Sequence, residues 1–248
     1  MVIGKGILAR YLEPLLRGDR QACRAVVEET LQSGVPANAV YLDLIWPIMT
    51  EIEHLLRQGK ITAVQEHLAT RINRTIIAQL QNKLPRRPKK TNKVAICCSP
   101  EELQELGAQM LTDLFESDGW DVRFLGGGLT NDDLLSFIHQ YAPTILMVYG
   151  ISPKQAPDLR RLIDTIKSVN AWPEMRIMVC GGLFNRADGL WEEMEADLHA
   201  ANAVEAIQMA CNCQEIPRCE RRTINRRKKR RLVLGAKLPA PRVSASVA

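Results

Sequence analysis

A basic, proline-containing segment at residues 83–93 divides the sequence into two parts with different hydrophobic periods. Before it, apolar residues recur at helical spacing; after it, short continuous apolar runs alternate with helical patterns. The segment itself holds two prolines, six basic residues and one apolar residue, a composition typical of a linker. The sequence therefore predicts a helical domain at residues 1–82, a linker at 83–93 and a domain of different architecture from residue 94 onward.

The first part is predicted to be a helical bundle. Apolar residues repeat at helical spacing through residues 5–33, 37–57 and 63–82, which gives four or five helices with short connections. Asp19 and Thr62 stand where side-chain caps of later helices are expected. Pro47 lies inside the segment 37–57 and predicts a kink or a break near Trp46.

The second part, residues 94–214, is predicted to be a doubly wound parallel sheet. Apolar strands are expected at 94–98, 121–125, 144–149 and 176–180. Helices are expected at 102–117, 131–140, 155–169, 191–195 and 202–213. Continuously apolar strands are covered on both faces, and right-handed crossovers arrange about five of them into one sheet. The fold class is therefore α + α/β: an N-terminal helical bundle followed by a doubly wound five-stranded parallel sheet.

The positive charge is concentrated in a tail at residues 215–248, whose composition predicts disorder. The net charge is +5, and the run at 221–231 carries eight cations without an acid, so the remainder is near −3. Such a run binds nucleic acid phosphates or an acidic protein surface, or else remains a solvated tail. The cations are Arg221, Arg222, Arg226, Arg227, Lys228, Lys229, Arg230 and Arg231.

The sequence predicts a cytoplasmic protein. No apolar run reaches the roughly 20 residues of a transmembrane helix, and the N-terminus lacks the apolar core and cleavage site of a signal peptide. The cysteines number seven, and an odd number fits free thiols in a reducing compartment. Cys211, Cys213 and Cys219 lack a fourth ligand for a structural zinc site, so no metal is expected there.

The loop after the first expected strand, within residues 94–107, is the candidate ligand site, because open parallel sheets bind ligands at the carboxyl ends of their strands. A second loop, Gly126-Gly127-Gly128, is either a flexible turn or a turn whose amides approach an anion. No catalytic acid, base or nucleophile is grouped at these loops beyond the glutamates of a helix start, so an enzyme is not expected.

The order of these segments resembles the cobalamin-binding module of methionine synthase, corrinoid methyltransferase carriers and light-sensing B12 transcription regulators. Glu102, Gln104 and Gly107 match its Asp/Glu-x-His-x-x-Gly motif. The other matching segments are Gly119–Gly126, Tyr149-Gly150-Ile151, Gly181-Gly182-Leu183-Phe184-Asn185, Glu195-Ala196-Asp197, Gly59-Lys60-Ile61 and Glu66-His67-Leu68-Ala69. The resemblance covers residues 5–213 and implies a cobalamin, adenosyl or hydroxo, between bundle and sheet.

The resemblance implies a set of cofactor-binding residues. They are Glu102, Gln104, Gly107, Gly126, Tyr149, Gly150, Ile151, Gly181, Gly182, Phe184, Leu56, Glu66 and His67.

The sequence departs from the module at three of these positions. Gln104 replaces the histidine that binds cobalt from below, and an amide is a poor cobalt ligand. Tyr149 replaces a serine that hydrogen-bonds the nucleotide tail, and Leu56 replaces a cap tryptophan of the light sensors. His67 is either an upper cobalt ligand or a helix histidine paired with Glu66. The cofactor is then a cobalamin without the lower ligand, another tetrapyrrole, or none.

The resemblance implies a regulatory or sensory protein that modulates transcription through a protein partner, a transcriptional regulator. The alternatives are a corrinoid carrier in methyl transfer, against which Gln104 argues, and a scaffold that has lost cobalamin.

Overall fold

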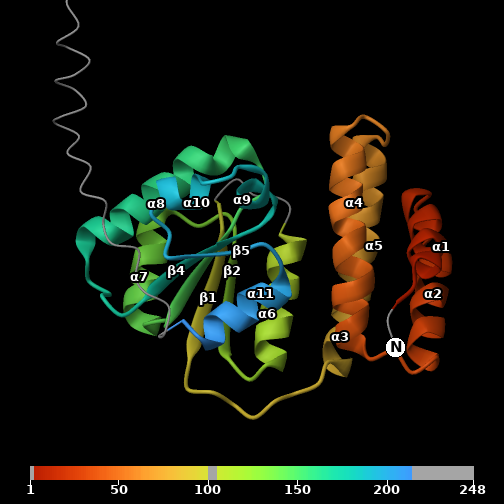
Figure 1. The fold of residues 1–248 in the computed structure, drawn as a ribbon, viewed down its shortest axis with the longest axis horizontal. Coiled ribbons are helices and arrows are strands. Elements are labelled where there is room, and N and C mark those ends of the chain that lie inside the picture. Colours follow the sequence, from red (N-terminus) through yellow and green to blue (C-terminus); the bar gives the residue numbers. More distant parts are fainter. Residues whose placement is uncertain (1–2, 100–104, 214–248) are drawn as a thin grey trace, which may run out of the picture. The chain divides into compact units, whose positions relative to one another are not determined.

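The computed structural model describes residues 3–99 and 105–213, which belong to one compact unit (Figure 1). Its first part is entirely helical. The elements are α1 (Lys5–Leu16), α2 (Arg20–Gln32), α3 (Ala37–Ala39), η1 (Val40–Ile45), α4 (Trp46–Arg57), α5 (Ala63–Leu80) and the short η2 (Gln81–Lys83). The two expected caps are confirmed: Asp19 accepts from the backbone of Ala22, and Thr62 forms a capping box with Gln65.

The distortion expected near Trp46 is a π-helical turn rather than a break. Residues of η1 lie between α3 and α4, and the amide of Trp46 donates to the carbonyl of Tyr41, five residues back. Pro47 follows in the first turn of α4 and has no amide hydrogen to continue the ladder. The helix therefore changes its hydrogen-bonding pattern just before the proline and then continues.

The second part confirms the predicted doubly wound sheet. Its strands are β1 (Lys93–Cys98), β2 (Asp121–Gly126), β3 (Ile145–Tyr149), β4 (Arg176–Cys180) and β5 (Leu198–Ala200). All pairs are parallel and the order is β2-β1-β3-β4-β5, so the chain reverses its direction of growth at β1 and β3. In the register, Cys98 is opposite Tyr149, and Tyr149 is opposite Cys180.

Helices cover both faces of this sheet (Figure 1). They are α6 (Leu106–Ser117), α7 (Asn131–Tyr141), η3 (Pro153–Gln155), α8 (Ala156–Val169), α9 (Gly182–Arg186), α10 (Leu190–Glu193) and α11 (Ala203–Cys211). Alternate side chains of β1 show the two layers: Val94 and Ile96 pack with α6, α11 and the bundle, whereas Ala95 and Cys97 pack with α7 and α8. One apolar core thus runs from the bundle through α6 to the sheet.

The segment between η2 and β1 is fastened to the α/β part. The amide of Arg87 donates to the carbonyl of Ser117 at 2.9 Å, and the amide of Lys90 donates to that of Gly119 at 2.7 Å. The side chains of Arg87 and Lys90 both donate to the buried carboxylate of Asp118. Two of the basic residues that marked this segment as a linker therefore neutralise a buried acid.

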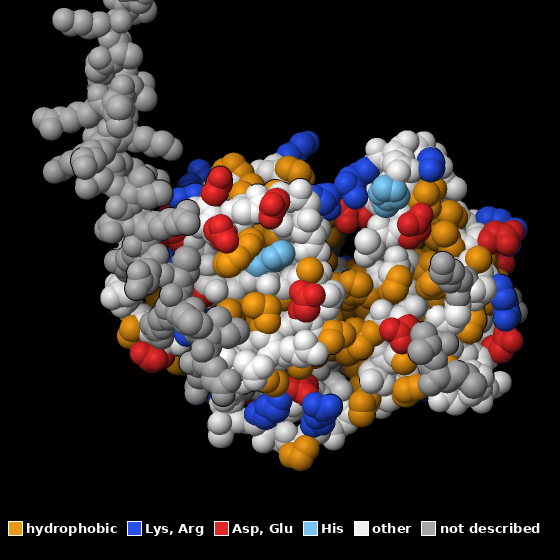
Figure 2. Space-filling model, in the orientation of Figure 1, with side chains coloured by type: hydrophobic (Ala, Val, Ile, Leu, Met, Phe, Trp, Pro, Cys, Tyr) orange, Lys and Arg blue, Asp and Glu red, His pale blue; other side chains and the backbone are white. Residues whose placement is uncertain are grey.

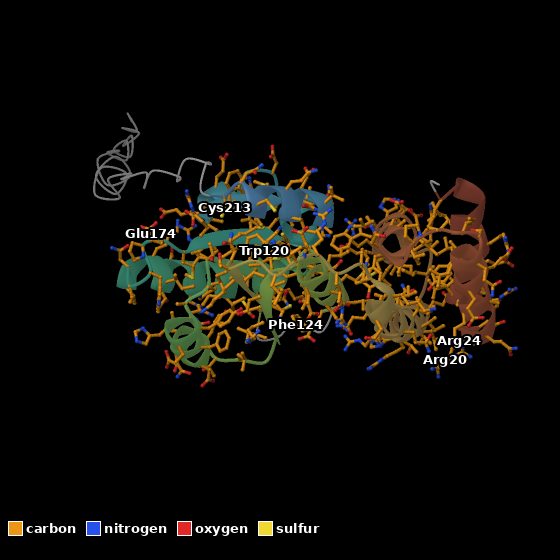
Figure 3. All side chains as sticks on the ribbon, turned by 90° about the horizontal axis from the view of Figure 1, so that it is seen from below. Arg20, Arg24, Trp120, Phe124, Glu174 and Cys213 are labelled. Carbon is orange, nitrogen blue, oxygen red and sulfur yellow. The ribbon has the colours of Figure 1, made fainter. Side chains whose placement is uncertain are left out.

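Trp120 is buried, and Figure 3 shows it inside the α/β part. Its ring meets Phe115 edge to face at 5.4 Å, and the ammonium of Lys90 lies 5.6 Å from the ring centroid. In the described ranges, no helix is long and apolar enough to cross a membrane.

Candidate functional site

A cleft of about 270 Å³ opens between the helices α4 and α5 and the carboxyl ends of β3 and β4. Figure 2 shows a hollow in this face of the molecule, with hydrophobic side chains along its walls. The lining residues are Trp46, Met49, Thr50, Ile52, Glu53, Arg57, Glu66, Thr70, Asn73, Leu106, Gly107, Tyr149, Ile151, Gly181, Gly182, Asn185, Arg186 and Ala201. The cleft therefore lies at the sheet edge where open α/β folds bind ligands.

Glycines form much of the floor of the cleft. Gly181 follows β4 with a φ of 103°, a conformation that is essentially restricted to glycine. A Cβ atom on Gly181 would lie 2.3 Å from the carbonyl oxygen of Gly150. The turn after β4 therefore requires glycine, and it places a residue without a side chain in the lining of the cleft.

Tyr149 ends β3 and fills the space beside Gly107. A Cβ atom on Gly107 would lie 2.0 Å from the hydroxyl oxygen of Tyr149. Tyr149 is 5% exposed, so its ring belongs to the core and only a small part of the residue reaches the cleft. Below the cleft, the gap between α6 and β3 is thus occupied by an aromatic side chain.

The opposite wall of the cleft carries a polar stripe on α5. Glu66, Thr70 and Asn73 are four and three residues apart, so they lie on one helix face. The hydroxyl of Thr70 donates to the carboxylate of Glu66 at 3.0 Å. This wall therefore offers hydrogen-bonding groups, while Trp46, Met49 and the floor offer apolar surface.

Asn73 is the most deeply buried polar member of this stripe, with 1% exposure. Its Oδ1 accepts a hydrogen bond from the hydroxyl of Tyr11 at 2.7 Å, and its Nδ2 has no hydrogen-bond partner among the described residues.

An ion pair joins the two walls. Arg186 on α9 pairs with Glu53 on α4 and also donates to the carbonyl of Ile151 at 2.5 Å. The side chains of Arg186 and Glu53 are 26% and 25% exposed, so the pair is partly desolvated. Arg57, one turn further along α4, lies 3.7 Å from the same carboxylate.

Two buried cysteines of the sheet have raised pKa values. Burial raises the pKa of Cys97 and that of Cys180 to about 12, so both are neutral thiols at physiological pH. Across residues 3–99 and 105–213, no group of three or more His, Cys, Asp or Glu side chains is placed to hold a metal ion.

The structure brings about half of the expected site residues to the cleft. Gly107, Tyr149, Ile151, Gly181, Gly182 and Glu66 line it. The expected residues outside its lining are Gly126, Gly150, Phe184, Leu56 and His67. Glu102 and Gln104, and the basic tail at 221–231, lie outside the described residues.

The residues outside the lining have other surroundings. His67 is on an exposed face of α5, whereas Leu56 packs against the bundle core. Phe184 is 2% exposed and packs with α8. Near Gly126, the amide of Gly127 donates to the Glu105 carboxylate at 2.5 Å, so an acid of the chain already uses one amide of this glycine turn.

Several lining residues were not anticipated from the sequence. Trp46, Glu53, Thr70, Asn73 and Arg186 carry no motif. The signal that could have found the α5 stripe is the helical spacing of Glu66, Thr70 and Asn73, three polar residues on a face that otherwise faces apolar neighbours.

A larger cavity, of about 740 Å³, lies at the opposite end of the sheet, near the start of β2. Its lining mixes cations with acids, and two of the cations, Arg87 and Lys90, already pair with Asp118. The smaller cleft combines apolar walls, glycine backbone and an unpaired donor, so we take it as the candidate site.

Two family models match the chain, and both are described as a B12 binding domain. The first matches residues 7–81 and the second matches residues 92–208. Among curated proteins, none matches the sequence significantly.

Among solved structures, the chain is similar to the monomethylamine corrinoid protein from Methanosarcina barkeri. The TM-score is 0.75 at 18% identity, and the alignment covers 85% of this chain and 100% of that one. A cobalamin-binding protein from Desulfitobacterium hafniense aligns with a TM-score of 0.46 and 17% identity over 87% of this chain and 100% of that one. The first similarity establishes that the two proteins share a fold.

Proposed function

The chain belongs to the family of B12-binding proteins, and on this premise we propose that its cleft binds a corrinoid. The observation that carries the proposal is that both matched regions supply the walls of one cleft. Residues 7–81 contribute the α4 and α5 wall, and residues 92–208 contribute the floor from Gly107 to Ala201.

The lining fits such a ligand in character. Trp46, Met49 and Ile151 offer apolar surface to a flat macrocycle, and Arg57 and Arg186 offer donors to groups at its edge. Gly181 and Gly182 present no side chain to a ligand in the cleft. Drug-sized ligands occupy pockets of about 300–1,000 Å³, so the cleft of about 270 Å³ must widen to admit a corrinoid.

A bound corrinoid would supply a cobalt centre at which ligands can exchange. The chain's own contribution is to hold the ring between α4, α5 and the sheet edge, and so to couple occupancy to the spacing of bundle and sheet. We propose that this coupling serves a regulatory function through a protein partner, a transcriptional regulator. Gln104 supports a regulator over a carrier, because its amide does not replace the imidazole that the resemblance implies below cobalt.

A corrinoid carrier for methyl transfer is the second candidate, favoured by the shared fold with the monomethylamine corrinoid protein. Loading with cobinamide, which has no nucleotide base, separates the two. We expect the Co(II) electron paramagnetic resonance spectrum to show no nitrogen splitting in the wild type and to gain it in Gln104→His. Nitrogen splitting in the wild type that persists in His67→Ala would instead mean that the protein supplies a lower ligand, as a carrier requires.

Binding itself is tested by a matched pair of variants. Thr50 lines the cleft and Thr75 does not, while both hydroxyls donate to the carbonyl four residues back in their helix. The wild type and Thr75→Trp should retain hydroxocobalamin or adenosylcobalamin through gel filtration, with a visible spectrum and about one cobalt per chain. Thr50→Trp should lose it, because an indole fills the cleft. If the wild type is colourless after reconstitution, the corrinoid proposal is rejected, and a scaffold that has lost cobalamin remains as the function.

We also propose that the basic tail contributes to partner or nucleic acid attachment. Deleting residues 221–231 should then weaken attachment and reduce its dependence on salt, because up to eight phosphate or carboxylate contacts are lost. Unchanged binding of the truncated chain would reject this contribution without affecting the cleft proposal.

A further inference from the structure

The Asn73 amide has one satisfied end and one unsatisfied end. Oδ1 accepts the Tyr11 hydroxyl proton at 2.7 Å, but Nδ2 has no partner within the described part of the chain. Asn73 is 1% exposed and is one of the residues that line the cleft. A buried donor without an acceptor is costly, and buried amides in folded proteins are usually paired. The Nδ2 atom is itself buried, so it becomes available to a bound group only as the cleft widens.

The orientation of the amide follows from Tyr11. Tyr11 is fully buried, and burial raises the pKa of its hydroxyl, so the hydroxyl keeps its proton. Asn73 Oδ1 is the acceptor that the structure gives to this proton. Turning the amide over would place two donors against each other or leave the Tyr11 proton unpaired. Nδ2 is therefore the end that remains for a ligand.

The neighbouring polar groups already have partners within the protein. Thr70 already donates to the Glu66 carboxylate, one turn earlier on α5. Arg57 and Arg186 are both engaged by Glu53 at the other wall. Among the cleft residues, Asn73 thus combines near-complete burial, a fixed orientation and an unused donor.

We propose that Asn73 Nδ2 donates a hydrogen bond to an oxygen atom of the corrinoid and thereby fixes the face that the ring turns toward α5. This inference rests on the proposed function. The oxygen belongs either to an axial ligand or to an amide side chain at the ring edge, since both are acceptors. Asn73 thus contributes to ligand affinity, and Tyr11 holds its amide in position.

A double variant tests the proposal without leaving a buried polar group unpaired. Tyr11→Phe with Asn73→Leu removes both polar partners together, which is close to neutral for folding. We expect its denaturant midpoint without ligand to equal or exceed that of the wild type, and its affinity for hydroxocobalamin to fall about tenfold. Tyr11→Phe alone should have a smaller effect on affinity, because Nδ2 is kept but is no longer oriented. Thr75→Val, away from the cleft, is the control.

A comparison of two ligands locates the acceptor oxygen. Hydroxocobalamin and methylcobalamin share the ring amides but differ in the axial oxygen. If the double variant loses affinity for both ligands, the acceptor is an oxygen of a ring amide. If it loses affinity for hydroxocobalamin alone, the acceptor is the axial oxygen. Asn73→Ala, which removes the donor and leaves room beside the Tyr11 hydroxyl, should reduce affinity in either case and serves if the double variant does not fold.

The outcomes separate the two proposals. A wild type that binds neither ligand overturns the proposed function. A wild type that binds, with the double variant and Asn73→Ala binding equally well, overturns the role of Asn73 and leaves the proposed function standing.

Discussion

The hydroxyl of Tyr41 on η1 lies 3.0 Å from a carboxylate oxygen of Asp113 on α6 and 2.9 Å from the backbone oxygen of Ile77 on α5. Tyr41 has one hydroxyl proton for these two oxygens. If Asp113 is protonated, it donates to Tyr41 while Tyr41 donates to Ile77, and every group is satisfied. If Asp113 is ionised, one acceptor has no proton. This contact between the bundle and the α/β part is therefore complete only with a protonated carboxyl.

Protonation of Asp113 should make stability depend on pH. Burial raises its pKa to about 6, the Tyr41 hydrogen bond opposes the rise, and the Glu116 carboxylate adds to it. In the unfolded chain the pKa is near 4, so the folded state binds the proton more tightly. The contribution of this bound proton to the free energy of unfolding is complete below pH 4 and is lost as the pH rises through 6. The loss amounts to about 3 kcal/mol at pH 7 and above.

Asp113→Asn isolates this effect, because its amide can donate to the Tyr41 oxygen at every pH. We expect the difference in unfolding free energy between variant and wild type to rise in favour of the variant from pH 4 to pH 7. Urea denaturation at several pH values measures it. A difference that does not change with pH would mean that Asp113 is ionised in the folded state throughout.

The ion pair between Glu53 and Arg186 should slow corrinoid entry, because it joins the two walls of a cleft that must widen. Glu53→Gln removes the charge but keeps the shape. We expect its association rate with hydroxocobalamin to rise by about three- to tenfold, measured by stopped-flow absorbance, in line with an ion pair of roughly 1 kcal/mol. Glu51→Gln changes an exposed carboxylate of the same helix and is the matched control. Equal rates for the two variants would show that the pair does not limit opening.

The sequence predicted the architecture because each element carried its own periodic signal. The continuous apolar run Val94–Cys98 predicts a buried parallel strand, and the structure covers both of its faces. For strand β5, Leu198–Ala200, the sequence predicted no position; it predicted only that the sheet has about five strands. With three residues β5 is too short to show a period, and its pairing with β4 decides its structure.

The site was less predictable, because it depends on residues brought together from separate elements. The glycine motifs led to Gly107, Gly181 and Gly182, since a backbone that excludes a Cβ leaves a mark in the sequence. No such mark exists for the pairing of Glu53 with Arg186, 133 residues apart. The unpaired end of Asn73 depends on Tyr11, 62 residues earlier, and is visible only in three dimensions.

Gly181 should be among the least replaceable residues of the floor. Its φ of 103° is unfavourable for any side chain, and a Cβ would also meet the Gly150 carbonyl oxygen at 2.3 Å. Gly128 has a φ of 80° but no atom within 4 Å of such a Cβ, so Gly128→Ala measures the backbone cost alone. We expect a loss of about 1 kcal/mol for Gly128→Ala and at least about 3 kcal/mol for Gly181→Ala by chemical denaturation. Similar losses of stability in the two variants would mean that the turn after β4 shifts to accommodate the Cβ atom on residue 181.

Tyr149 should decide which corrinoids bind. Its ring fills the space beside Gly107, and the resemblance implies that a smaller residue at this position contacts the nucleotide tail. Tyr149→Ser opens that space, so we expect its affinity for cobalamin to rise by about tenfold relative to cobinamide, which lacks the nucleotide. The wild type should bind the two about equally.

Tyr149→Phe keeps the ring and is the matched control for this prediction. The ratio of the two affinities is the quantity to measure, because both ligands bind the same folded protein and a loss of core packing in Tyr149→Ser cancels from it. Isothermal titration of each variant with cobalamin and with cobinamide gives this ratio. A wild type that already prefers cobalamin, with no change in Tyr149→Ser, would mean that the nucleotide is accommodated elsewhere in the cleft and that the ring of Tyr149 does not exclude it.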